Sequence, residues 1–272
     1  MAVALRRAAH QLLDSPVVFD DPLALSIVGP EGLARLRDGQ AKHRERFSVA
    51  LRAFVVARAR ATEEALARAV DRGVSQFVVL GAGLDTFAYR NPYNTVRVFE
   101  VDHPATQEWK RGLLSAAGIA RPASMTFAPV DFEHQRLVDG LASAGMDLQA
   151  PALFSWLGVT MYLTADAFSS TLDFIAARPP ASGVVFDYAV ARESLGWTER
   201  LALSMLEKRV AAAGEPFRTF FSPAALHQRL LESGFTTIED LAGDDLNVRY
   251  FANRTDRLRV TGGMGRLATA WR

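Results

Sequence analysis

Residues 76–102, QFVVLGAGLDTFAYRNPYNTVRVFEVD, decide the fold of this chain. A short apolar run ends abruptly in Gly81-Ala82-Gly83, and a second run, rich in β-branched residues, ends in Glu100 and Asp102. This order predicts a strand, a glycine turn, a helix, a second strand and then a carboxylate. Glycines let the backbone approach a ligand closely, and an acid about 20 residues further on can bind the two hydroxyls of a ribose. The stretch therefore predicts a site for a cofactor that contains a nucleoside.

The residues after the glycines favour one cofactor over another. A dinucleotide fingerprint has a small residue three positions after the second glycine, where this chain has Thr86 preceded by Asp85. A pyrophosphate would lie at the helix N-terminus, where the carboxylate of Asp85 would repel it. S-adenosylmethionine carries a sulfonium and no phosphate, so we favour it over NAD(P). The alternative is purely structural, with the glycines forming a tight turn and Asp85 capping a helix.

Composition limits the classes of function. The chain has 272 residues, 49% of them hydrophobic, and a formal net charge of +1 from interspersed acidic and basic residues. This balance argues against nucleic acid or an anionic membrane surface as the main partner. No cysteine is present for a disulfide, a thiolate metal site or a nucleophile. We found neither an apolar run long enough to cross a bilayer nor a signal peptide, and we therefore expect a cytoplasmic protein.

The rest of the chain alternates between strand-like and helix-like segments. We predict strands at 76–80, 95–101, 125–130, 152–157, 183–189, 236–241, 257–261 and 266–271, and helices at 2–14, 23–40, 44–72, 104–117, 133–144, 164–177, 195–213 and 222–233. This alternation predicts an α/β fold with a doubly wound, mostly parallel sheet. We expect the last two strands to form an antiparallel hairpin across Gly262-Gly263. We predict a single domain over 1–272, with a helical cap from about 1–50 and 190–220.

Four motifs together resemble a known family. FVVLGAGLDTFAYR, VFEVDHP, PVDF and SWLGVTMYLT look like the leucine carboxyl methyltransferase family, and most of all its bacterial, mainly actinobacterial, branch. The resemblance runs from about Ala8 to the C-terminal LRVTGGMGRLATA. It implies a Rossmann-like class I methyltransferase that uses S-adenosylmethionine, with Gly81, Ala82, Gly83 and Asp85 beside the cofactor. It also implies that Asp102 binds the ribose, and Glu100 is the alternative.

Arg58 lies at the edge of the apolar face of the predicted helix 44–72, where an arginine needs a buried anion or must reach past the core. The resemblance implies that this anion is the carboxylate of the methionine tail. It further implies that Asp131 and Phe132 hold the adenine. The alternative for Asp131 is a helix N-cap.

The segment SWLGVTMYL follows a predicted strand on the reaction side of such a sheet. Ser155 and Trp156 are candidates for cofactor contact, and Trp156 and Tyr162 are candidates for the substrate side. For Tyr162, packing in the core is an equal alternative. Many family members have a glutamate where this chain has Leu157, so protein leucine-carboxyl activity does not carry over directly. The five histidines show no metal-ligand spacing, and we expect no metal site.

These observations predict O-methylation of a small metabolite, with a carboxylate as one class of acceptor. We expect Trp197, Phe217, Phe220 and Phe221 of the cap to shape a partly apolar acceptor pocket. Two other classes of function stay open, an NAD(P)-dependent oxidoreductase and a non-catalytic protein that binds S-adenosylmethionine. The sequence does not determine the oligomeric state.

Overall fold

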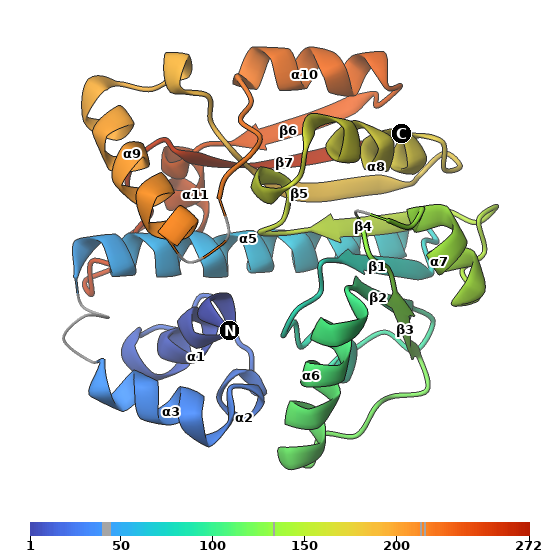
Figure 1. Cartoon of the computed structure of the whole chain (residues 1–272), viewed down its shortest axis with the longest axis horizontal. Coiled ribbons are helices and arrows are strands. Elements are labelled where there is room, and N and C mark those ends of the chain that lie inside the picture. The colour runs from blue at the N-terminus through green and yellow to red at the C-terminus, as the bar shows by residue number, and fades with distance from the viewer. Residues whose placement is uncertain (40–44, 133, 213, 215) are drawn as a thin grey trace.

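The computed structural model describes residues 1–39, 45–132, 134–212, 214 and 216–272. Its centre is a seven-stranded sheet in the order β3-β2-β1-β4-β5-β7-β6, shown in Figure 1. The strands are β1 (Gln76–Leu80), β2 (Arg97–Asp102), β3 (Met125–Pro129), β4 (Ala152–Trp156), β5 (Gly183–Ala189), β6 (Thr237–Leu241) and β7 (Gly265–Trp271). The first five are mutually parallel, and β7 runs antiparallel to both β5 and β6. The predicted doubly wound, mostly parallel sheet is confirmed.

Strand order places the site. From β1 the chain winds outward through β2 to β3, then returns to β4 on the other side of β1. This reversal between β1 and β4 creates a crevice at the carboxyl ends of the two strands, where ligands bind in sheets of this kind.

The helices form layers on both faces of the sheet. They are α1 (Ala2–Leu13), α2 (Ala24–Ile27), α3 (Gly29–Asp38), α5 (Arg46–Asp71), α6 (Pro104–Ala116), α7 (Leu137–Ser143), α8 (Ala165–Ala176), α9 (Trp197–Ala212), α10 (Pro223–Glu232) and α11 (Gly243–Tyr250). Successive side chains of a strand point to opposite faces. Val78 and Leu80 thus join the core formed with α7, α8 and α10, whereas Phe77 and Val79 join the core formed with α5 and α11. The predicted helix ends at 40, 44, 133 and 213 lie outside the described residues.

Three predictions about local structure were wrong. Residues 257–261 form no strand, because the side-chain amide of Asn247 donates to the Val260 carbonyl at 2.9 Å and accepts from its N–H at 2.8 Å. The antiparallel pair at the C-terminus is therefore β6 with β7, separated by α11, and no hairpin crosses Gly262-Gly263. The helix expected after the glycine turn is only a single 3-10 turn, Phe87–Tyr89.

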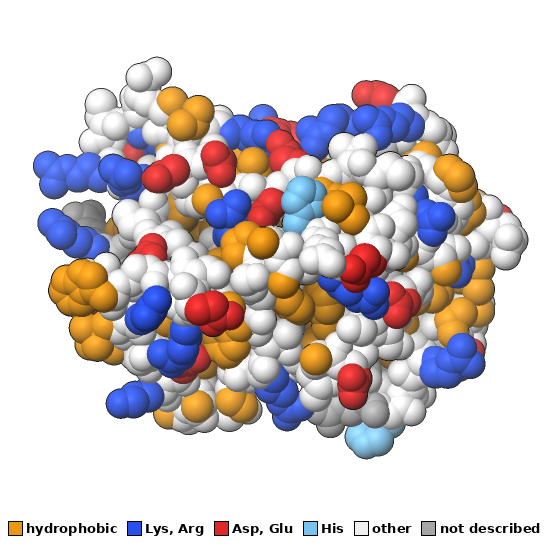
Figure 2. Space-filling model, turned by 90° about the horizontal axis from the view of Figure 1, so that it is seen from above, with side chains coloured by type: hydrophobic (Ala, Val, Ile, Leu, Met, Phe, Trp, Pro, Cys, Tyr) orange, Lys and Arg blue, Asp and Glu red, His pale blue; other side chains and the backbone are white. Residues whose placement is uncertain are grey.

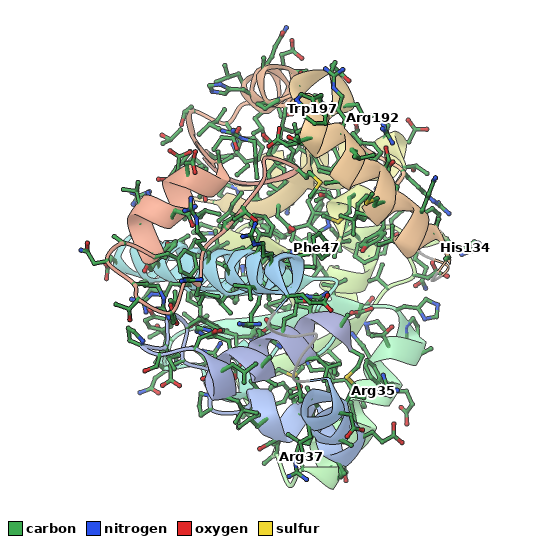
Figure 3. All side chains as sticks on the ribbon, turned by 90° about the vertical axis from the view of Figure 1, so that its left-hand side faces the viewer. Arg35, Arg37, Phe47, His134, Arg192 and Trp197 are labelled. Carbon is green, nitrogen blue, oxygen red and sulfur yellow. The ribbon has the colours of Figure 1, made fainter. Side chains whose placement is uncertain are left out.

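The segments predicted as a cap flank the long helix α5. Figure 1 and Figure 3 both show α5 between the N-terminal helices α1–α3 and helix α9. The face seen in Figure 2 carries basic and acidic side chains side by side, with hydrophobic side chains between them. No helix among the described residues is long and apolar enough to cross a membrane.

Candidate functional site

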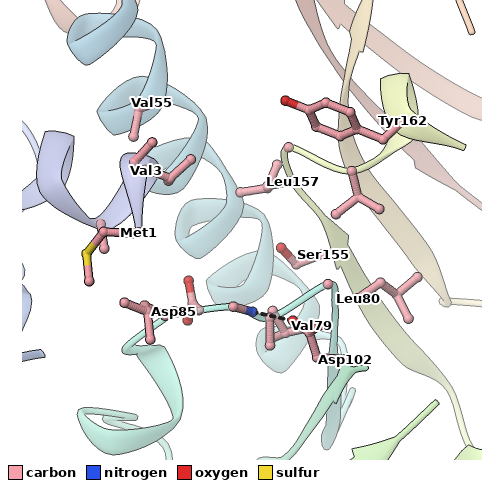
Figure 4. Close-up of a pocket in the computed structure, with 18 of the residues that line it drawn as sticks. Met1, Val3, Val55, Val79, Leu80, Asp85, Asp102, Ser155, Leu157 and Tyr162 are labelled. Atoms are coloured by element: carbon pink, nitrogen blue, oxygen red, sulfur yellow. Dashed lines mark hydrogen bonds between the residues drawn. The ribbon is translucent and has the colours of Figure 1, made fainter. Parts of the chain in front are cut away.

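A cavity of about 760 Å³ lies at the carboxyl ends of β1, β2 and β4 (Figure 4). Its floor is the glycine turn after β1, with Asp102 of β2 and Ser155 of β4 beside it. Helix α5 contributes Arg58, and the start of α1 covers the opposite side. Predicted site residues that line it are Arg58, Gly81, Ala82, Gly83, Asp85, Asp102, Phe132, Ser155 and Tyr162. The structure thus brings together residues from most of the predicted motifs.

The glycine turn needs its glycines. Gly81 has φ +66° and Gly83 has φ +45°, both in the left-handed region that disfavours side chains. A Cβ added at Gly81 would lie 2.4 Å from a methyl group of Val159. The N–H of Ala82 donates to the Val101 carbonyl at 3.0 Å, which anchors the turn against β2. The turn therefore presents backbone without side chains at the place where a ligand would approach it.

Asp102 faces the cavity from the end of β2. One carboxylate oxygen accepts from the Gly83 N–H at 2.6 Å, drawn as a dashed line in Figure 4, and the other accepts from the N–H of His103 at 2.7 Å. These bonds fix the carboxylate beside the glycine turn. The structure thus places Asp102 at the cavity, and its binding to a ribose stays a prediction.

Glu100, the alternative acid, lies elsewhere. Its side chain is 1% exposed, accepts from the Lys110 ammonium at 2.6 Å and does not line the cavity. Burial raises the pKa of Glu100 to about 7, although Lys110 opposes the shift. We therefore withdraw Glu100 from the set of cofactor ligands and treat it as a structural residue.

Asp85 lines the cavity and has a cation beside it that sequence reasoning missed. The guanidinium of Arg7 in α1 lies 3.3 Å from the Asp85 carboxylate, which also accepts from the Phe87 N–H at 2.8 Å. Burial disfavours the charge on Asp85, but the charges of Arg7 and Lys110 outweigh it and hold the Asp85 pKa below its usual value. Asp85 therefore binds the first N–H of the 3-10 turn, whose N-cap is Thr86, and stays ionised at the cavity.

Arg58 does have a buried anionic partner, which the sequence did not reveal. Its guanidinium donates to the carboxylate of Asp187 in β5 at 2.5 Å, and both side chains are almost fully buried. The second Asp187 oxygen accepts from the Gly158 N–H, also at 2.5 Å. A Cβ at Gly158 would lie 2.9 Å from the other terminal nitrogen of Arg58. The guanidinium is thus fixed between a carboxylate and a glycine turn at the cavity wall.

The remaining candidates divide between the cavity and the core. Phe132 lines the cavity, whereas Asp131 lies outside the lining and contacts the His134 ring at 2.8 Å. Asp131 is also not the N-cap of α7, which is Arg136. The prediction of Trp156 as a substrate-side residue was wrong, because its ring is fully buried and stacks on Phe168 at 5.1 Å. Ser155, its neighbour on the strand, faces the other side and lines the cavity.

Comparison with known proteins agrees with this fold. The family model of leucine carboxyl methyltransferases matches residues 1–176. YktD of Bacillus subtilis (strain 168), named as a candidate S-adenosyl-L-methionine-dependent methyltransferase, is 32% identical over 94% of this chain and 91% of its own length. A similarly named protein of Frankia alni is 36% identical over 66% of this chain and 64% of its own.

Solved structures show the same architecture. The crystal structure of a candidate methyltransferase from Thermobifida fusca superposes with a TM-score of 0.61 at 17% identity, covering 91% of this chain and 92% of that one. Magnesium protoporphyrin IX methyltransferase from Synechocystis, with S-adenosylhomocysteine bound, gives 0.50 at 13% identity over 93% of this chain and 100% of that one. The fold is that of the class I methyltransferases. More narrowly, this chain belongs to the leucine carboxyl methyltransferase family.

Proposed function

We propose that this protein transfers a methyl group from S-adenosylmethionine to an oxygen atom of a small metabolite. The cofactor is S-adenosylmethionine, which family membership and the names of the relatives support. The observation that carries the proposal is the cavity at the β1–β4 switch point, where a glycine turn, a fixed carboxylate and a buried guanidinium meet.

The groups around the cavity fit the three parts of this cofactor. The Asp102 carboxylate suits the ribose hydroxyls, and the open backbone at Gly81 and Gly83 lets the ligand approach closely. Phe132 offers an apolar surface for the adenine ring. The Arg58 guanidinium suits the carboxylate of the methionine tail. When bound, S-adenosylmethionine supplies an activated methyl group, and the protein supplies alignment and an electrostatic environment.

The side chains around the cavity favour an oxygen atom as the methyl acceptor. A carboxylate acceptor is already ionised at neutral pH and needs no general base, whereas an alcohol benefits from one. The Asp187 carboxylate, which lies behind Arg58, already accepts from Arg58 and Gly158. Leu157 lines the cavity with an apolar side chain, so it adds no base there. We therefore favour a small acceptor that carries a carboxylate.

The two alternatives have separate tests. Thermal-shift assays with S-adenosylhomocysteine and with NADH distinguish a methyltransferase from an oxidoreductase, and we expect only S-adenosylhomocysteine to raise the melting temperature. Incubation with S-adenosylmethionine labelled on its methyl group and a panel of small carboxylic acids, phenols and alcohols then tests catalysis. Label transfer to one class identifies the acceptor chemistry. Binding without transfer to any member of the panel would favour a non-catalytic role.

A further inference from the structure

A second cavity, of about 380 Å³, adjoins the first. The two share lining residues Ala2, Val3, Val55, Arg58, Gly158 and Tyr162, so they meet at the wall formed by α1, α5 and the segment after β4. Tyr162 and Phe217, two residues that the sequence analysis placed near the substrate, line it, but most of its walls come from parts of α5, α9 and the segment before β7 that no motif marks. A molecule bound in it would lie directly beside the contents of the first cavity.

The walls of the second cavity are mostly apolar. Helix α5 contributes Phe47, Leu51 and Phe54, and helix α9 contributes Leu203, Leu206 and Val210. Among the aromatic residues expected to shape an acceptor pocket, only Phe217 lines it. Trp197 is 79% exposed, and Phe220 and Phe221 pack against the core. The residues that form the pocket thus differ from those predicted, whereas its apolar character is as predicted.

Charge in this cavity is largely compensated. Among the described residues that line it, only Arg6, Arg58 and Asp187 are charged, and no histidine is present. Arg58 and Asp187 neutralise each other in a buried ion pair at the junction with the first cavity. The hydroxyl of Tyr188 donates to Asp240 at 2.8 Å. Ligand pockets are typically apolar with a few fixed polar groups, and this cavity has that character.

We propose that the second cavity binds the methyl acceptor, and that the acceptor is a small, mostly apolar molecule rather than the tail of a protein. The inference rests on the proposed function, since only a methyltransferase needs an acceptor beside its cofactor cavity. The apolar walls bury the body of the acceptor, and its oxygen atom lies near Arg58 and Gly158, residues that line both cavities. Helices α5 and α9 then limit the size of the acceptor from two sides of the cavity.

The test uses N-phenyl-1-naphthylamine, an uncharged molecule whose fluorescence rises in apolar surroundings, with the full chain saturated with S-adenosylhomocysteine. We expect saturable binding of one probe per chain. Leu206→Trp and Val210→Phe add bulk at two half-buried positions of the cavity and should each weaken the probe at least tenfold. Met205→Trp is the matched control, because Met205 lies on the same helix but is 63% exposed and does not line the cavity.

Each outcome of this experiment supports or overturns the proposed acceptor site. The proposal is overturned if the wild type does not bind the probe, or if both cavity variants bind it as tightly as the wild type does. It is also overturned if Met205→Trp weakens the probe more than the cavity variants do. A six-residue peptide ending in leucine that displaces the probe more strongly than free apolar carboxylic acids would overturn the class of acceptor. S-adenosylhomocysteine is titrated separately into wild type and each variant before saturation and without the probe, and it should bind all of them equally. If it fails to bind the wild type, the proposed function fails. If it binds and the probe results are negative, only the acceptor site is refuted.

Discussion

The guanidinium of Arg58 donates a 2.5 Å hydrogen bond to the carboxylate of Asp187, although 129 positions separate the two residues in the chain. This buried pair joins helix α5 to strand β5 at the wall between the two cavities. Its location gives it two effects that can be measured separately, one on the stability of the fold and one on the ligand.

Breaking the pair should destabilise the protein. Asp187→Ala leaves the Arg58 charge buried without its carboxylate, which costs about 3–5 kcal/mol for pairs of this kind. Urea unfolding of Asp187→Ala, Arg58→Ala and the double variant should give a large coupling energy. The matched control is the exposed pair Arg60–Glu64 on the same helix, expected at about 0.3–0.5 kcal/mol. A coupling for Arg58–Asp187 as small as that of the control would contradict a structural role for the pair.

Arg58 should also recognise the methionine tail. A guanidinium can bind a carboxylate through two parallel hydrogen bonds, which a lysine ammonium cannot reproduce. We expect Arg58→Lys to weaken S-adenosylhomocysteine about tenfold, or roughly 1.4 kcal/mol, and to leave adenosine nearly unaffected. Arg60→Lys, on the exposed side of α5, should change neither affinity. Equal weakening of adenosine by Arg58→Lys would show that Arg58 acts only through the fold.

Asp102 should contribute to binding through the ribose. Asp102→Ala removes a hydrogen-bonding charge, a loss of about 1.5–3 kcal/mol, so adenosine and S-adenosylhomocysteine should both bind at least tenfold more weakly. Glu100→Gln should alter neither affinity appreciably, because Glu100 lies outside the cavity. Calorimetric titration of both variants checks this. Greater loss of affinity in Glu100→Gln, with the variant folded, would reverse the assignment.

Glu100 should instead make stability depend on pH. Burial raises the pKa of Glu100 to about 7 in the folded protein, above its ordinary value of 4.5. Between these two values the folded state holds a proton that the unfolded state releases, so stability contributed by Glu100 falls as pH rises, by up to about 1.4 kcal/mol per pH unit. Relative to Glu100→Gln, the wild type should lose stability from pH 4.5 to 7 in urea titrations. A constant difference between the two proteins over this range, or a relative gain by the wild type, would show that Lys110 keeps Glu100 ionised throughout.

The sequence predicted the parts of the site that local patterns define. The run from β1 through the glycine turn to β2 is continuous in sequence, and its apolar residues and glycines specify strands and a turn directly. Glu100 and Asp102 could not be separated in the same way, because residues two apart on a strand share a face. What distinguishes them is depth, since Asp102 ends the strand at the cavity and Glu100 lies further inside the sheet.

Residues that meet through tertiary structure were missed. Arg7 reaches Asp85 across 78 positions and Asp187 reaches Arg58 across 129, and no periodicity or spacing signals either contact. Trp156 shows a different limit. It neighbours Ser155 on β4, so only one of the two can face the cavity, and the small polar residue does while the large ring fills the core.

The most direct test of the central claim is a calorimetric titration of the purified chain with S-adenosylhomocysteine, performed with wild type and Asp102→Ala in parallel. The cavity formed by the glycine turn, Asp102 and Arg58 predicts a micromolar dissociation constant for the wild type, near 8 kcal/mol of binding free energy, and clear weakening in the variant. Absence of binding by the wild type at about 1 mM, which corresponds to roughly 4 kcal/mol, would contradict the account.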